Sequence, residues 1–330
     1  MRYPLRNPYL IYRRIGEDEY LIENLLYSES YTVNYRTALF LRSLDGKTDP
    51  YTLLPGHNRK EVMQLMERMR KCNMLARKKK PVKTGTGSYM WPLVYCFPQK
   101  SHKYPAIIWN CLLMLLFLPV FITGLYLFYS KSISLQMDSY ADLFAGMMLG
   151  AIPGMIFHEL SHACAGLTYN GHLFEMGIGI STFLPMGYIA LDTRCIKSRA
   201  QRIQTDAAGI EMNLLLSGMF YILSSMRFID PFVMYLAAII NLVFAVFNAL
   251  PLYSIDGLNI LSAVIGKDDA LKYAVELIMD RKKRKESPLP DAKRWHLFAA
   301  YALIGFQAVL PLTLLYELYS VWELILILTC

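Results

Sequence analysis

Long apolar stretches separated by short polar loops fill the last two thirds of the chain. Each stretch nearly free of charged residues predicts a membrane-spanning helix, because a helix needs about 20 apolar residues to cross a bilayer. The predicted spans are 105–129, 140–167, 207–226, 231–265 (broken near Pro251) and one or two more within 295–328. We therefore expect a polytopic α-helical membrane protein with five or six transmembrane helices.

The apolar segment 173–191 differs from the predicted spans because helix-breaking residues interrupt it. Gly177, Gly179, Pro185 and Gly187 all fall within it, which favours a re-entrant hairpin or short strands over a regular span. A strand edge here could receive an extended substrate peptide, since a helical peptide bond is shielded and must be unwound before attack.

The first 80 residues predict a small domain outside the membrane. Two strand-like runs, Tyr9–Arg14 and Tyr20–Asn24, flank a polar turn, which is typical of a hairpin. A third extended run at 31–34 precedes a short helix near 37–41, and Glu61–Leu75 has apolar residues at helical spacing. Strands followed by helices predict an α+β, winged-helix-like domain.

Residues 81–104 are interpreted as a basic linker between this domain, at 1–80, and the membrane domain, at 105–330. The run RKKKPVK at 77–83 and the TGTGS that follows it contain few residues that favour regular structure. We therefore expect an unstructured tether here.

Composition and charge fit a membrane protein. Of 330 residues, 55% are hydrophobic and 18% charged, and the mean hydropathy is +0.29. The net charge of +8 would suit nucleic acid, but the basic residues gather at span edges, near 77–83, 197–202 and 281–285. This placement favours contact with anionic lipid and a cytoplasmic N-terminal domain, with no nucleic-acid partner. The six cysteines have no paired spacing, so we expect reduced thiols.

The sequence His158-Glu159-Leu160-Ser161-His162 is an HExxH motif inside the predicted span 140–167. Positions i and i+4 of a helix share one face, so both imidazoles can reach one metal ion. Glu159 would lie beside that ion, where it can take a proton from the attacking water. Ionisable residues inside an apolar helix are costly, which favours a functional site over a chance pattern.

A third metal ligand is expected from the segment NALPLYSIDG, which runs from Asn248 to Gly257. Pro251 breaks the helix there, and Asp256 then places a carboxylate in an apolar setting. Asp256 would complete a site of two histidines and one carboxylate for Zn²⁺, with an open fourth position. An Asp-Gly pair also occurs in ordinary turns, and it is the HExxH motif that favours the ligand role.

These two motifs together resemble the site-2 protease family of intramembrane zinc metalloproteases. The second motif matches the family signature Asn-x-x-Pro-x-x-x-x-Asp-Gly, and Ala208–Asn213 resembles its Gly-x-x-x-Asn element, with Ile210 where the family usually has proline. The segment YNGHLFEMGIGISTFLPMGYIALDT resembles a bacterial subgroup associated with peptide maturation and export.

The resemblance covers about residues 105–265, and it implies a membrane site facing the cytoplasm. It implies zinc held by His158, His162 and Asp256, and a catalytic Glu159. Further candidates for the substrate cavity are Asn213, Asn248 and Glu211, the last an intramembrane carboxylate.

The N-terminal domain resembles the PqqD-like fold, the RiPP recognition element. The residues that carry the resemblance are Leu21–Glu23, Thr32–Asn34, Thr37-Ala38 and Leu44–Lys47. Such modules bind a leader peptide as an added strand at a sheet edge. The resemblance implies a peptide substrate bound through residues 1–80 and an export transporter as a further partner. A winged-helix-like domain with another partner is the alternative.

The leading hypothesis is a zinc-dependent intramembrane endopeptidase that cleaves a peptide or membrane-associated substrate, with the leader of a ribosomally synthesised modified peptide as the candidate. A non-catalytic membrane peptide receptor or export scaffold is an alternative, and Glu159 argues against it because a structural site needs no base. A protease acting on a membrane-tethered transcription regulator is a third reading. Such relatives often carry a PDZ domain, and no segment here is long enough for one.

Overall fold

A computed structural model describes most of the chain. The described residues are 3–24, 29–76, 82–83, 89–96, 100–131, 139–181, 184–193, 195–196, 198–226, 230–252, 255–267, 270–282, 299–305 and 307. The fold is mostly helical and divides into two compact units. One comprises Met1–Pro98 with Leu173–Leu191, and the other Gln99–His172 with Asp192–Cys330.

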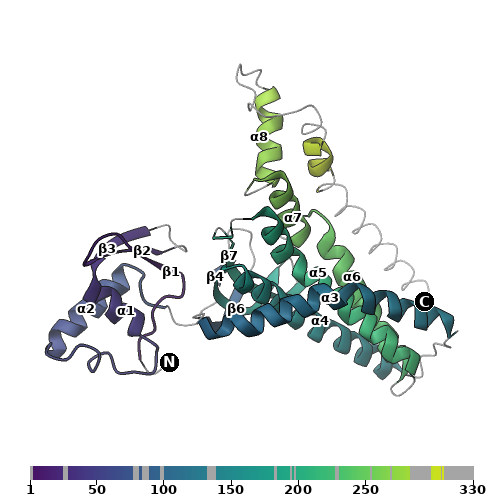
Figure 1. Ribbon diagram of the computed structural model, residues 1–330, viewed down its shortest axis with the longest axis horizontal. Helices are drawn as coiled ribbons and strands as arrows, with labels where there is room; N and C mark the ends of the chain where they lie inside the picture. Colours follow the sequence, from purple (N-terminus) through teal and green to yellow (C-terminus); the bar gives the residue numbers. More distant parts are fainter. Residues whose placement is uncertain are drawn as a thin grey trace, which may run out of the picture. The chain divides into compact units, whose positions relative to one another are not determined.

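The N-terminal residues form the predicted α+β arrangement. Strands β1 (Leu10–Arg14), β2 (Glu19–Asn24) and β3 (Glu29–Asn34) form an antiparallel sheet in the order β1-β2-β3, with helices α1 (Tyr35–Ser43) and α2 (Arg59–Lys71) after them (Figure 1). The predicted hairpin, the third strand and both helices are therefore confirmed.

Local capping explains where these two helices begin. The Asn34 side chain accepts the Thr37 N–H at 2.9 Å, and Asn58 and Glu61 form a reciprocal capping box at the start of α2. The two helices then bury Leu41 and Val62 with Ile22 of the sheet in one small apolar core.

A second sheet occupies sequence that we interpreted partly as a tether. Strands β4 (Val82–Lys83), β5 (Tyr89–Tyr95), β6 (His172–Ser181) and β7 (Leu184–Asp192) form it in the order β4-β5-β6-β7. The tether interpretation is wrong for β4 and β5, because the aromatic and β-branched run YMWPLVY pairs with β6. The expectation that 173–191 forms strands and not a regular span is confirmed, although the two strands are long, with 10 and 9 residues.

Two features of the second sheet follow from its side chains. The pairing of β5 with β6 is irregular between Pro92 and Val94, since proline has no N–H to donate to the ladder. The buried Glu175 carboxylate accepts a hydrogen bond from the Tyr188 hydroxyl at 3.0 Å. Burial and this carboxylate raise the pKa of Tyr188, so its hydroxyl remains a donor over the physiological range.

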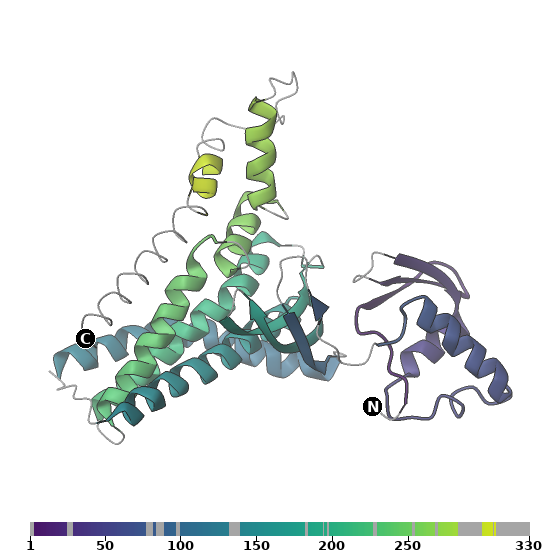
Figure 2. The same cartoon turned by 180° about the vertical axis from the view of Figure 1, so that it is seen from behind.

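Four described helices are long and apolar enough to cross a membrane: α3 (Lys100–Ser130), α4 (Tyr140–Thr168), α5 (Arg199–Met226) and α6 (Pro231–Ala249). They lie side by side in a bundle (Figures 1 and 2). These lengths and compositions indicate a membrane protein. The predicted fifth and sixth crossings fall in 295–328, which lies outside the described residues except for the helical 299–305 and 307.

Two of the helices differ in length from the predicted spans. The helix that contains the third predicted span begins at Arg199, because the eight polar-rich residues before Ala207 continue the same helix. The fourth ends at Ala249, and the residues beyond the Pro251 break form two separate helices, α7 (Asp256–Ile265) and α8 (Ala270–Lys282). At 10 residues, α7 is too short to cross a bilayer.

Helix α5 is the centre of the bundle and contacts α3, α4, α6 and α7. Its close approach to α3 depends on two glycines: a Cβ added at Gly124 would lie 2.3 Å from the Gly218 carbonyl oxygen, and one at Gly218 would lie 2.5 Å from the Phe121 Cα. Small residues allow helix backbones to touch in this way inside membranes.

We expect Gly218→Ala to destabilise the bundle by about 1–3 kcal/mol, because the added methyl group would force α3 and α5 apart. Thermal unfolding of the detergent-solubilised protein measures this loss. Gly305→Ala is the matched control, since no described atom lies within 4 Å of a Cβ at that helical position. Equal melting temperatures for the two variants would contradict the close α3–α5 contact.

Candidate metal centre

The two HExxH histidines lie on one face of α4, one turn apart. His158 and His162 are each 7% exposed, and their ring centroids are 4.7 Å apart. Their Nε2 atoms approach to 3.1 Å, so both lone pairs point to the same place. The expected geometry of positions i and i+4 is therefore confirmed.

Asp256 brings a carboxylate to the same point from another part of the chain. It is the first residue of α7, which begins after the Pro251 break that ends α6. Its Oδ2 atom lies 3.0 Å from His158 Nε2 and 3.2 Å from His162 Nε2. The predicted convergence of the three side chains is confirmed.

The spacing of these atoms suits a small tetrahedral cation. Ligand atoms about 2.0–2.1 Å from a tetrahedral zinc ion lie about 3.3 Å from one another. The three separations, 3.0, 3.1 and 3.2 Å, are close to that value and give each atom room to bind one ion at the centre of the group. Two imidazoles and one carboxylate are also the donor set of known hydrolytic zinc sites.

A backbone contact from α5 fixes the orientation of one imidazole. His162 Nδ1 lies 2.7 Å from the Thr205 carbonyl oxygen, which can only accept a hydrogen bond. Nδ1 therefore carries the proton, and the Nε2 lone pair remains available to a metal. Metal-binding histidines usually have such a second partner, which sets both the tautomer and the ring angle.

Because Gly209 of α5 has no side chain, the two imidazoles can occupy the space beside it. A Cβ added there would lie 2.4 Å from His162 Nε2 and 2.5 Å from His158 Cε1. No real Cβ approaches other atoms so closely, and here the neighbours are rings held by other contacts. The absence of a side chain at Gly209 is therefore a requirement of the site.

Ser161 of the HExxH motif contacts α3 through Trp109. Ser161 is fully buried, donates to the Phe157 carbonyl at 2.8 Å and accepts the Trp109 indole N–H at 3.2 Å. The first bond lies within α4, so it is the Trp109 contact that helps to set the rotation of α4 and the direction of its histidines. Glu159 is half-buried on the same turn of α4, next in the chain to His158.

The three candidates for the substrate cavity have different surroundings. Asn213 is 1% exposed, and neither its Oδ1 nor its Nδ2 has a hydrogen-bond partner among the described residues. Glu211 accepts a hydrogen bond from Gln204 at 2.7 Å, and Asn248 donates to the Phe244 carbonyl of its own helix at 3.0 Å. None of the three is among the atoms that converge with Asp256.

Sequence reasoning missed Thr205, Gly209 and Ser161 as parts of the site. Gly209 falls inside the Gly-x-x-x-Asn element, and its small size was the available signal of a close approach. Thr205 contributes only a backbone carbonyl, which no pattern of residue types reveals.

Comparison of the chain with family models, with curated proteins and with solved structures found no match. The functional argument therefore depends on the residues and their geometry alone.

Proposed function

We propose that the protein is a zinc-dependent intramembrane endopeptidase of the site-2 protease type. The observation that carries this proposal is the convergence of His158, His162 and Asp256 within hydrogen-bond distance, with Glu159 next to the first ligand. These groups lie on or beside helices apolar enough to cross a membrane, where ionisable side chains are costly without a function.

Each residue has a distinct role in the proposed hydrolysis. His158, His162 and Asp256 would hold zinc, which supplies Lewis acidity for the attack on a peptide carbonyl. Glu159 accepts the proton of the attacking water and then donates it to the leaving amine. Thr205 holds the His162 ring, and Gly209 keeps the space beside both rings open.

The N-terminal domain would recruit the peptide substrate. Strand β3 lies at one edge of its sheet, and its residues alternate between half-buried and exposed. Such an edge can bind an extended peptide through backbone hydrogen bonds. A leader peptide of a ribosomally synthesised modified peptide fits this mode, with an export transporter as the further partner. The basic loops favour a cytoplasmic position for this domain and for the catalytic site.

Removal of the carboxylate ligand tests the proposal. We expect Asp256→Ala to lower zinc affinity by more than about 100-fold, since loss of a ligand should exceed the usual cost of losing a residue that only orients one. Elemental analysis of the purified full-length chain measures bound zinc, which should be about one ion per chain in the unaltered protein. Labelling of new peptide N-termini in producing cells measures cleavage, which should disappear in the variant.

Glu276→Gln is the control, because Glu276 is an exposed carboxylate on α8 that pairs with Lys272. It should match the unaltered protein in both measurements. A protein that binds zinc but yields no cleavage product in any form would favour the receptor or export scaffold instead. An Asp256→Ala variant with full zinc content would contradict the ligand set.

A further inference from the structure

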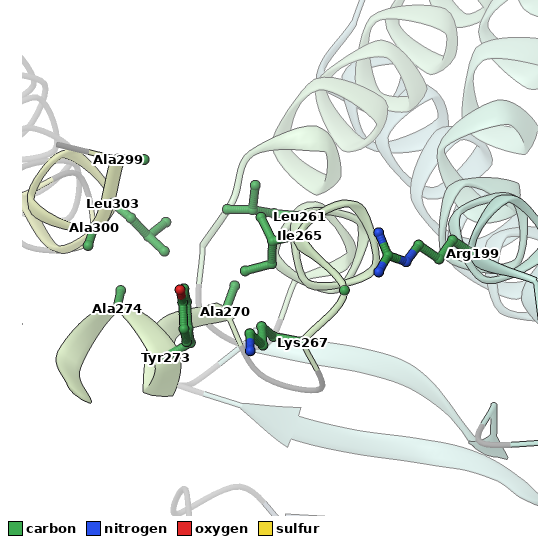
Figure 3. A pocket seen from close by; sticks show the side chains of 11 residues that line it. Arg199, Leu261, Ile265, Lys267, Ala270, Tyr273, Ala274, Ala299, Ala300 and Leu303 are labelled. Carbon is green, nitrogen blue, oxygen red and sulfur yellow. The ribbon is translucent and has the colours of Figure 1, made fainter. Parts of the chain in front are cut away.

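A second candidate binding site lies beside α7, and none of the three metal ligands lines it. It is a cavity of about 270 Å³ between α7, α8, the start of α5 and the helical segment 299–305 (Figure 3). Leu261, Ile265 and Leu303 give it an apolar wall together with several alanines, and Arg199 and Lys267 add positive charge to the lining, with Arg199 on the side of α7 away from Leu303. The lining is therefore amphipathic.

The Arg199 guanidinium lies beside the C-terminal end of α7. Gly266 caps that helix in the left-handed conformation, with φ +71°, and a Cβ added there would lie 2.6 Å from Arg199 Nη2. The guanidinium thus occupies the space that a side chain at position 266 would need. Among the residues that the structure describes, no carboxylate pairs with Arg199.

Lys267 supplies the second cation. Its ammonium lies 4.8 Å from the centre of the Tyr273 ring, whose face attracts the positive charge. Within the described part of the chain it also has no acidic partner. Two cations without a carboxylate partner among the described residues therefore belong to the lining of this cavity.

The position of Arg199 on its helix indicates what could bind. Arg199 is the first residue of α5, one of the helices long enough to cross a membrane, and basic residues at such helix ends lie at the level of lipid headgroups. We propose that this cavity binds one anionic phospholipid, with its phosphate on Arg199 and Lys267. The start of an acyl chain would lie along Leu261, Ile265 and Leu303.

The size of the cavity agrees with partial burial of such a molecule. Its volume is slightly below the roughly 300 Å³ at which small-molecule sites begin. The cavity would therefore hold the headgroup end of the lipid, and the rest of the acyl chains would stay in the bilayer. The competing explanation is that both cations only stabilise the negative end of the α7 dipole. A neutral lipid would then bind as well as an anionic one.

Native mass spectrometry of the full-length chain in a neutral detergent tests the proposal, with phosphatidylglycerol as the probe and phosphatidylcholine as the neutral comparison. We expect phosphatidylglycerol to be retained in preference. Arg199→Gln and Lys267→Gln should each weaken its binding about five-fold, the equivalent of about 1 kcal/mol per cation near a membrane surface. Arg199→Lys should retain most of the binding, because it keeps the charge.

Lys272→Gln is the matched control, since it removes one charge from an exposed position of α8 outside the cavity. It should bind phosphatidylglycerol like the unaltered chain. Equal weakening by this control would overturn the proposal in favour of diffuse electrostatic attraction. Unchanged binding by Arg199→Gln and Lys267→Gln would also overturn it, because the two cations would then only stabilise the negative end of the α7 dipole. Displacement of the lipid by inorganic phosphate alone would refute a role for the apolar wall. If Arg199→Gln does not fold, Lys267→Gln decides the result.

Discussion

Glu159→Gln is expected to reduce peptide cleavage by about 10²–10⁴-fold, the usual contribution of a general base, while zinc content stays unchanged. Glutamine has nearly the same shape as glutamate but does not accept a proton at neutral pH. The three ligand side chains, which approach one another to 3.0–3.2 Å, are untouched by the change. Loss of cleavage with full zinc content would therefore separate catalysis from metal binding.

Two measurements on each variant give this comparison. Elemental analysis reports zinc per chain, and labelling of new N-termini in producing cells reports cleavage. Glu276→Gln, which replaces an exposed carboxylate on α8 by a carboxamide, should behave like the unaltered chain in both measurements. Cleavage at the normal rate by Glu159→Gln would rule out Glu159 as the base, and loss of zinc would show that Glu159 is part of the metal centre.

The sequence predicted the convergence of the three candidate ligands because each depends on a local pattern. Helical periodicity aligns His158 with His162, and the break at Pro251 releases the chain so that Asp256 can turn back toward them. The boundaries of the fourth span were less predictable. Apolar composition continues past the break, and nothing in composition distinguishes one long span from a helix followed by the short α7.

Partners distant in sequence account for what the sequence did not reveal. Strand β5 follows a basic, glycine-containing run, and its main pairing in the sheet is with the distant β6, from Tyr89 with Ile180 to Tyr95 with Glu175. Such non-local pairing has no local signal. The same holds for Thr205, whose carbonyl contacts an imidazole on a different helix.

Gly209→Ala is expected to reduce zinc affinity by about 10–100-fold, the range typical of residues that orient metal ligands. The added methyl group would lie 2.4 Å from His162 Nε2 and 2.5 Å from His158 Cε1, so at least one ring must rotate. Rotation of His162 would also break its 2.7 Å contact with the Thr205 carbonyl, which sets its tautomer. Competition with a zinc-binding dye measures the affinity of the purified full-length chain.

The design of this experiment separates a damaged site from a damaged fold. Gly305→Ala, a glycine-to-alanine change in a helix where no described atom lies within 4 Å of the new methyl group, should bind zinc like the unaltered chain. Thermal unfolding without added zinc should show Gly209→Ala to be folded, and excess zinc should restore part of its cleavage activity. Unchanged zinc affinity in Gly209→Ala would mean that the two imidazoles do not need the space beside α5. The close packing of α5 against the HExxH face of α4 would then have no part in the metal centre.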